Sequence, residues 1–289
     1  RGWQLRRGDV FVRLDGAGGI TAVDMRLPLA AAEVICGFGE RFDALDVRGR
    51  VATLYDLDAW EGLIYGLQNH IYKPIQLFHS SAGYSAFINS TCRLRVDGGR
   101  RWPDRLRLTQ HGAILDWFVW LDAPLAALDD YTALTGRPVR PPRWAFEPWF
   151  GGGWERWKKG PCQDPASEIR AVAQRFRQLD IPHSAVYAEG VAMDDPRTCA
   201  WLNPQGIRVL AWMNSDIPLD QQRRLLGGVA DGELPVLRRA GGEASTYVDF
   251  THPRAADLCD AFWRHRLDIG VAGSMVDFGD RVPEDAVCH

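Results

Sequence analysis

The sequence predicts an all-β sandwich domain at the N-terminus, followed by the first half of a (β/α)8 barrel. Short alternating or apolar runs, separated by Gly, Asp and Asn, fill residues 1–130. Apolar strands alternate with helical periods over residues 144–289, and a helical and proline-rich junction covers residues 131–143. With 289 residues, of which 46% are hydrophobic, the chain can build two sizeable cores.

The first part reads as strands at sandwich spacing, for example at residues 9–14, 84–89 and 115–121. Two of its stretches combine aromatic residues with acids, namely residues 37–42 and residues 55–60. Such loops suit sugar recognition, because a pyranose offers apolar faces and hydroxyl groups. A tight turn with surface charge explains them equally well, so both interpretations stay open.

The junction predicts one short helix over residues 125–134, ended by Gly136. Three prolines between residues 138 and 142 then stiffen the chain. We therefore expect a domain boundary with a rigid spacer.

Strand and helix signals alternate in the second part. The predicted order is strand 145–149, helix 165–179, strand 183–189, helix 195–202, strand 207–214, an irregular stretch 226–250, helix 253–267 and strand 272–278. This order predicts parallel strands joined by right-handed crossovers. Only four such units fit, whereas a complete barrel has eight, so we expect a chain truncated at both ends.

The predicted strands end in polar or aromatic residues, which are Trp149, Glu189, Asn214 and Asp277. Because the carboxyl ends of barrel strands form the active-site face, we expect these residues to converge. A buried strand that ends in an acid favours Glu189 as an acceptor for sugar hydroxyls. Trp149 and Trp212 either stack against a sugar ring or pack inside the barrel, and both interpretations stay open. Asn214 either forms hydrogen bonds at the start of a loop or contacts the ligand.

Composition excludes several classes of function. The net charge is −3 without a basic block, which argues against nucleic acid, and no apolar run reaches the ~20 residues of a membrane span. The six scattered cysteines form no C-x-x-C pair, so we expect free thiols, no metal site and a cytoplasmic enzyme. No dinucleotide fingerprint is present, and we expect no cofactor. The oligomeric state is not readable from the sequence.

Five stretches, taken in order, carry a family resemblance. They are residues 37–40, residues 72–75 with 81–89, residues 134–144, residues 248–253 and residues 275–280. Together they resemble glycoside hydrolase family 31, the α-glucosidase and α-xylosidase group. The resemblance covers most of the chain and ends after the strand that carries the nucleophile.

The resemblance implies a retaining mechanism in which Asp277 forms a covalent glycosyl-enzyme. The acid/base of that family is an Asp two strands further on, beyond residue 289, so we expect this piece alone to be inactive. Glu189 stands where the family usually has Asp, and Asp280 stands where it more often has Glu. Asp280 either contacts the sugar or orients a neighbouring group. Residues 277–285 look most like the sulfoquinovosidase branch, but residues 191–195 offer acids where a sulfonate needs cations.

Two other functions fit the same residues. One is a carbohydrate-binding protein that keeps the fold without catalysis, and the other is an α-transglycosidase. All three functions imply a carbohydrate ligand.

Overall fold

The computed structural model describes residues 9–14, 16–41, 43–56, 70–71, 73–152, 165–188, 195–214, 217–238 and 244–277. The chain divides into two compact units, and the boundary after Pro138 falls inside the predicted junction 131–143. No helix in the described ranges has the length and hydropathy that crossing a membrane requires.

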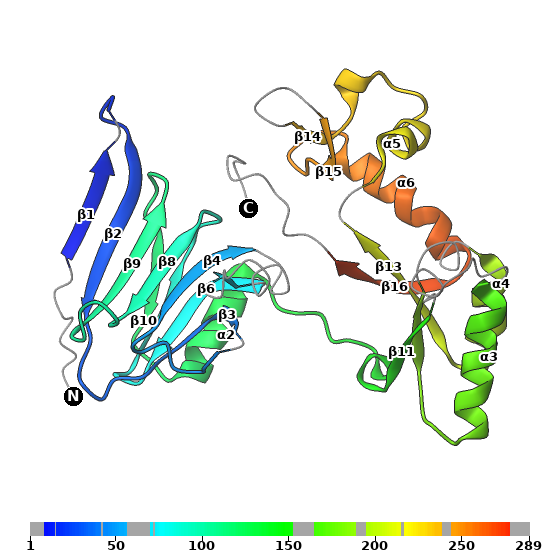
Figure 1. The fold of residues 1–289 in the computed structure, drawn as a ribbon, viewed down its shortest axis with the longest axis horizontal. Coiled ribbons are helices and arrows are strands. Elements are labelled where there is room, and N and C mark those ends of the chain that lie inside the picture. The colour runs from blue at the N-terminus through cyan, green and yellow to red at the C-terminus, as the bar shows by residue number, and fades with distance from the viewer. Residues whose placement is uncertain are drawn as a thin grey trace. The chain divides into compact units, whose positions relative to one another are not determined.

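The first unit consists of two β-sheets (Figure 1). The six-stranded sheet has the order β1 (Asp9–Leu14), β2 (Ile20–Pro28), β9 (Arg105–His111), β8 (Leu94–Gly98), β4 (Val51–Asp56), β5 (His70–Ile71). The four-stranded sheet has the order β10 (Trp117–Trp120), β7 (Tyr84–Ile88), β6 (Lys73–Ser80), β3 (Ile35–Glu40). Strand pairing is antiparallel except between β4 and β5.

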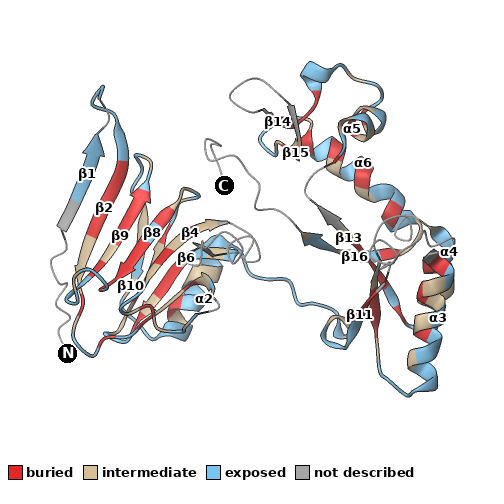
Figure 2. Cartoon of the chain, in the orientation of Figure 1, coloured by how far each residue is buried: buried red, intermediate tan, exposed pale blue. Residues whose placement is uncertain are grey.

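Both sheets bury side chains in one shared core (Figure 2). The six-stranded sheet contributes residues such as Leu54, Val96 and Leu108, and the four-stranded sheet contributes Phe78 and Ile88. All five are at most 2% exposed, as expected when every second residue of a strand points to one side. The predicted all-β character of this part is confirmed.

The Gly-Phe-Gly stretch at residues 37–39 lies in strand β3, where the neighbouring backbone leaves no room for a Cβ at either glycine. A Cβ on Gly37 would lie 2.6 Å from the Leu77 carbonyl oxygen, and one on Gly39 would lie 2.1 Å from that of Lys73. Both glycines have positive φ, which only glycine adopts without strain. Phe38 between them is fully buried, so the stretch has a structural role in this strand.

The predicted junction helix is present as α2 (Pro124–Thr135), and Gly136 follows it with φ 113°. The ring of Tyr131 contacts that of Phe87 of β7 edge-on, with centroids 5.0 Å apart. This contact ties α2 to the first unit rather than leaving it as a free spacer.

The second unit contains a parallel sheet in the order β11 (Trp149–Gly152), β12 (Ala185–Ala188), β13 (Arg208–Asn214), β16 (Val271–Asp277). The remaining elements are η1 (Arg143–Phe146), α3 (Pro165–Gln178), α4 (Pro196–Leu202), η4 (Asn203–Gln205), α5 (Leu219–Leu225), η5 (Asp231–Glu233), the hairpin β14 (Val236–Arg238) and β15 (Ala244–Val248), and α6 (Ala255–Asp268). The parallel pairing was predicted, whereas α5 and the hairpin were not.

Helices α3 and α4 pack against one face of this sheet. Ile169 of α3 and Leu202 of α4 are fully buried beside Val186 and Val209, which come from neighbouring strands. The apolar residues at helical spacing over 165–179 predict a buried stripe of Ile169, Val172, Ala173, Phe176 and Leu179. Ile169 and Ala173 are fully buried, and Val172 and Phe176 pack partly buried against the core, whereas Leu179 is 51% exposed.

The predicted bounds of the first strand, residues 145–149, are wrong. Residues 143–146 form the short helix η1, in which Ala145 N–H donates to the Pro142 carbonyl oxygen. Pro148 has no N–H to give to a ladder, so pairing of N–H groups begins only at Trp149. The strand consequently runs from Trp149 to Gly152, so it shares only Trp149 with the predicted strand and extends into residues 150–152, for which a loop was predicted.

The outer face of the six-stranded sheet holds a buried ion pair. Arg107 donates to both carboxylate oxygens of Asp24, at 2.7 and 2.5 Å, and Thr109 Oγ1 donates at 3.1 Å. Burial raises the pKa of Asp24, but the hydrogen bonds and positive charge of Arg107 outweigh it, so the pKa is lowered overall. Asp24 is only 4% exposed.

We expect Asp24→Asn to lower the free energy of unfolding by about 2–3 kcal/mol at pH 7. Breaking a fully buried pair costs ~3–5 kcal/mol, and the partial exposure of Arg107 reduces this. Because the folded pKa is lowered, this stabilisation is complete above the unfolded pKa of ~3.9 and disappears as pH falls through the folded pKa. Urea unfolding at neutral and acidic pH measures the difference.

The matched control is Asp104→Asn, which removes a surface pair with Arg105 at 3.8 Å. Its cost should stay below about 1 kcal/mol. Equal losses for the two variants would show that Asp24 contributes no more than a surface pair.

Candidate active site

Asp277 ends strand β16, and a tryptophan from the next strand holds its carboxylate. The indole Nε1 of Trp212 in β13 donates to Asp277 Oδ2 at 3.0 Å. The two residues are 65 positions apart in sequence, so only the parallel pairing of β13 with β16 brings them together. Both side chains are half-buried, which leaves the pair accessible to a ligand.

An irregularity in strand β16 decides which way Asp277 faces. Val209 pairs with Val271, but the next residue, Leu210, pairs with Gly273, so Ala272 is an extra residue in the ladder. Val271 belongs to the core under the helices. Strict alternation from Val271 would turn Asp277 toward that core, and the extra residue reverses the phase.

One register row forms the floor beneath this pair, on the face turned away from the helices. It runs from Gly151 through Tyr187 and Leu210 to Gly273. A Cβ on Gly151 would lie 2.3 Å from the Tyr187 ring, and one on Gly273 would lie 3.1 Å from Leu210 Cδ2. The glycines on the outer strands therefore make room for the large side chains of the middle strands.

Tyr187 is a site candidate that the sequence analysis missed. It lies in β12, one register row below Trp212, on the same face of the sheet. The run of three glycines from residue 151 predicts a loop after the strand 145–149, although glycines in or beside a strand also indicate the close approach of a large neighbour.

The structure brings some of the predicted site residues together and separates others. Asn214 is the register partner of Asp277, so its backbone lies at the same carboxyl edge of the sheet. Trp149 instead begins β11 at the level of Arg208, six residues before Asn214 and roughly 20 Å away along the strands. Glu189 and Asp280 lie outside the described residues.

Trp149 has a packing partner at its own end of the sheet. Its ring lies 6.1 Å from that of Trp144, and its indole Nε1 donates to the Trp144 carbonyl oxygen at 3.5 Å. These contacts do not connect it with the Asp277 edge.

The described part of the second unit gives little support to metal-dependent or cysteine-based catalysis. Within the described ranges no group of three or more His, Cys, Asp or Glu side chains is placed to hold a metal ion. Burial, aided by the charge of Asp195, raises the pKa of the Cys199 thiol to about 11. That thiol stays protonated at neutral pH and packs in the core under the helices.

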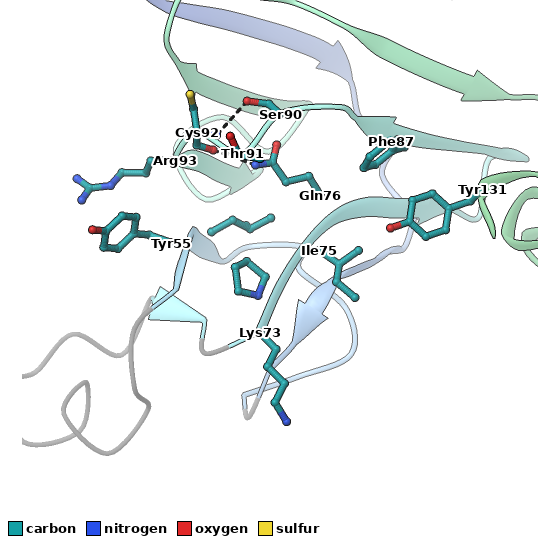
Figure 3. A pocket seen from close by; sticks show the side chains of 12 residues that line it. Tyr55, Lys73, Ile75, Gln76, Phe87, Ser90, Thr91, Cys92, Arg93 and Tyr131 are labelled. Atoms are coloured by element: carbon teal, nitrogen blue, oxygen red, sulfur yellow. Dashed lines mark hydrogen bonds between the residues drawn. The ribbon is translucent and has the colours of Figure 1, made fainter. Parts of the chain in front are cut away.

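The first unit has a separate pocket of about 410 Å³ (Figure 3). One end is formed by Tyr55, whose ring lies 4.4 Å from the Arg93 guanidinium carbon, and the other by Phe87 with Tyr131. Tyr55 belongs to the aromatic and acidic stretch 55–60, of which residues 57–60 lie outside the described ranges. The volume is typical of small-molecule sites, and aromatic walls with polar groups suit a sugar.

Solved structures share this fold. The cycloalternan-degrading enzyme of Trueperella pyogenes, in complex with a covalent intermediate, is similar with a TM-score of 0.75 and 21% identity. The similarity covers 92% of this chain and 43% of that one. Over that length the chain therefore has the same fold as that enzyme.

Sequence comparisons identify the family. Residues 13–97 match the model of the glycosyl hydrolase 31 N-terminal galactose mutarotase-like domain. An α-xylosidase of Lactiplantibacillus pentosus is 26% identical over 91% of this chain and 36% of its own length. An α-glucosidase of Saccharolobus solfataricus is 33% identical over 86% of this chain and 38% of its own length. The chain belongs to glycoside hydrolase family 31, and it spans little more than a third of these relatives.

We expect Gly151→Ala to destabilise the protein by about 1–3 kcal/mol, because the new methyl group must displace the Tyr187 ring. Denaturant unfolding measures the change. Gly232→Ala is the matched control, since a Cβ there meets nothing within 4 Å. In a Tyr187→Ala background the cost of Gly151→Ala should largely vanish, and an unchanged cost would mean that the ring is not the obstacle.

Proposed function

We propose that this chain is the part of a retaining α-glycosidase that carries the catalytic nucleophile, Asp277, on the first half of a (β/α)8 barrel. The observation that carries the proposal is the Trp212–Asp277 hydrogen bond at the carboxyl edge of a parallel sheet. Active sites of barrel enzymes are built at that edge. The α-xylosidase and α-glucosidase relatives support an α-linked sugar, cleaved at its non-reducing end, as the substrate.

In the proposed mechanism the Asp277 carboxylate attacks the anomeric carbon while the bond to the leaving oxygen breaks. A second carboxylic acid protonates that oxygen and later removes a proton from the water that releases the sugar. In retaining enzymes the two carboxyl groups lie about 5 Å apart. We assign the second acid to the part of the family fold that this chain, which spans little more than a third of its relatives, does not include, so the chain alone should be inactive.

Trp212 has a positioning role in this proposal. A hydrogen bond from its Nε1 fixes Asp277 Oδ2 and so limits rotation of the carboxylate. The flat indole face also offers an apolar surface to a sugar ring. Glu189, Asn214 and Asp280 are proposed to contact the sugar hydroxyls, since each follows or ends a strand at or near this edge in sequence. The position of Trp149 gives no support to a sugar contact for that residue.

We expect Asp277→Ala in the complete protein to lower kcat on aryl α-glucosides and α-xylosides by about 10⁴-fold or more, because the covalent step loses its nucleophile. A mechanism-based fluoroglycoside should label the wild-type protein on the peptide that contains Asp277, as read by mass spectrometry. The control Asp260→Asn, which removes an exposed ion pair on α6, should keep full activity.

The same experiment separates the alternatives. Sugar binding that survives Asp277→Ala, with no label on Asp277 and no turnover, would identify a non-catalytic carbohydrate-binding protein. A labelled Asp277 with transfer to added sugar outcompeting hydrolysis would identify an α-transglycosidase of the same fold. Labelling at another residue contradicts the assignment of the nucleophile.

We expect Trp212→Phe to lower kcat by about 10- to 100-fold with little change in KM. A hydrogen bond to a charged group contributes ~1.5–3 kcal/mol, and each 1.4 kcal/mol is a factor of ten in rate. Phe keeps an aromatic face for the sugar but cannot donate. Steady-state kinetics of the complete protein measure both constants, and a rise in KM at constant kcat would instead make Trp212 a sugar platform only.

A further inference from the structure

A small hollow of about 140 Å³ lies on the outer face of the six-stranded sheet, in the first unit. Its walls are strongly cationic: the lining residues are Arg13, Arg95, Arg101, Arg107, His111, Thr109 and Asp97. Four arginines thus face one lining carboxylate, in a protein whose net charge is −3. The hollow shares no residue with the Asp277 edge.

Strand register explains why these side chains gather. Arg95 of β8 pairs with Thr109 of β9, and His111 of β9 pairs with Ala22 of β2. Ala22 in turn pairs with Arg13 of β1, so a small residue separates the two basic ones. Residues that alternate with them, such as Leu108, are buried in the sandwich core, which turns the basic side chains outward.

The carboxylates of this face are already engaged. Asp24 accepts the bidentate bonds of Arg107, and Asp97 accepts the backbone N–H of Arg100 at 2.8 Å. Within the described residues, the guanidinium groups of Arg13 and Arg95 make no hydrogen bond or ion pair. Among the described residues, the positive charge that faces the hollow therefore exceeds the negative charge of Asp97 and Asp24.

We propose that this hollow binds a tetrahedral oxyanion, a sulfate or phosphate group, either free or as the ester of a small sugar. Arginine suits this chemistry, because its planar fork donates two parallel hydrogen bonds to oxyanions. The volume is below the ~300 Å³ of typical small-molecule sites, so a single charged group fits better than a saccharide chain. This binding is independent of the glycosidase activity proposed for Asp277.

Isothermal titration calorimetry of the whole chain with sodium sulfate, sodium phosphate and glucose 6-phosphate tests the proposal. Ionic strength is held constant with sodium chloride, because screening weakens any charged surface. We expect saturable binding of one anion per chain. Arg95→Gln and Arg13→Gln should each weaken it by about 10-fold or more, the scale of a lost charge-assisted hydrogen bond.

Two further variants sharpen the result. Asp97→Asn removes the lining negative charge and should tighten binding, whereas Arg100→Gln, which removes a neighbouring charge that does not line the hollow, should leave it unchanged. Asp277→Asn should also have no effect. Glucose 6-phosphate binding at least about 10-fold tighter than the inorganic anions would identify the ester as the ligand, and equal affinities would identify the free anion.

Titrations that do not saturate, or affinities that fall equally in the Arg95 and Arg100 variants, would overturn the proposal, because both outcomes describe a general charge effect. Arg95 is exposed, so loss of folding is not expected in its variant, and circular dichroism verifies this. A folded Arg95→Gln protein that binds sulfate like the wild type would also overturn it.

Discussion

The extra residue Ala272 in strand β16 is the constraint on which the candidate site depends. It allows Val271 to stay in the core under the helices while Asp277, six residues later, faces the opposite side of the sheet. Two requirements that strict alternation would place in conflict are met by one small residue. Deleting it would move either the core valine or the acid to the wrong face, because a one-residue slip inverts every later side chain.

The positions of Trp212 and Asp277 also depend on the packing of the register row beneath them, which runs from Gly151 to Gly273. Tyr187 and Leu210 on the two middle strands occupy the space that Gly151 and Gly273 leave on the outer strands. Along this row the residues on the two outer strands are therefore small and those on the two middle strands are large. Trp212 follows Leu210 by two residues in β13, so it lies on the same face, one row closer to the carboxyl edge, where its indole donates to Asp277.

The sequence predicted those features that repeat over many residues. The buried stripe of α3, the stop at Gly136 and the acid at the end of β16 all follow from periodicity or from local chemistry. The start of β11 was not predicted, because Pro148 permits a short helix before the strand as readily as a strand around it. The partnership of Trp212 with Asp277 was also invisible, since it rests on register across two strands and on one extra residue.

The cationic hollow is a second feature that the sequence alone does not predict. Its arginines come from β1, from β8 and the turn that follows it, and from β9, and no stretch of the sequence holds enough of them to mark a basic block. A sheet brings together every second residue of neighbouring strands, so charges that are sparse along the chain become dense on one face. Asp24 relieves part of that density by accepting the hydrogen bonds of Arg107, and the charge of Asp97 also acts on Arg107. Among the described residues, the positive charge of Arg13 and Arg95 stays without a carboxylate partner. This local excess arises from the folded sheet and cannot be inferred from the net charge of the chain.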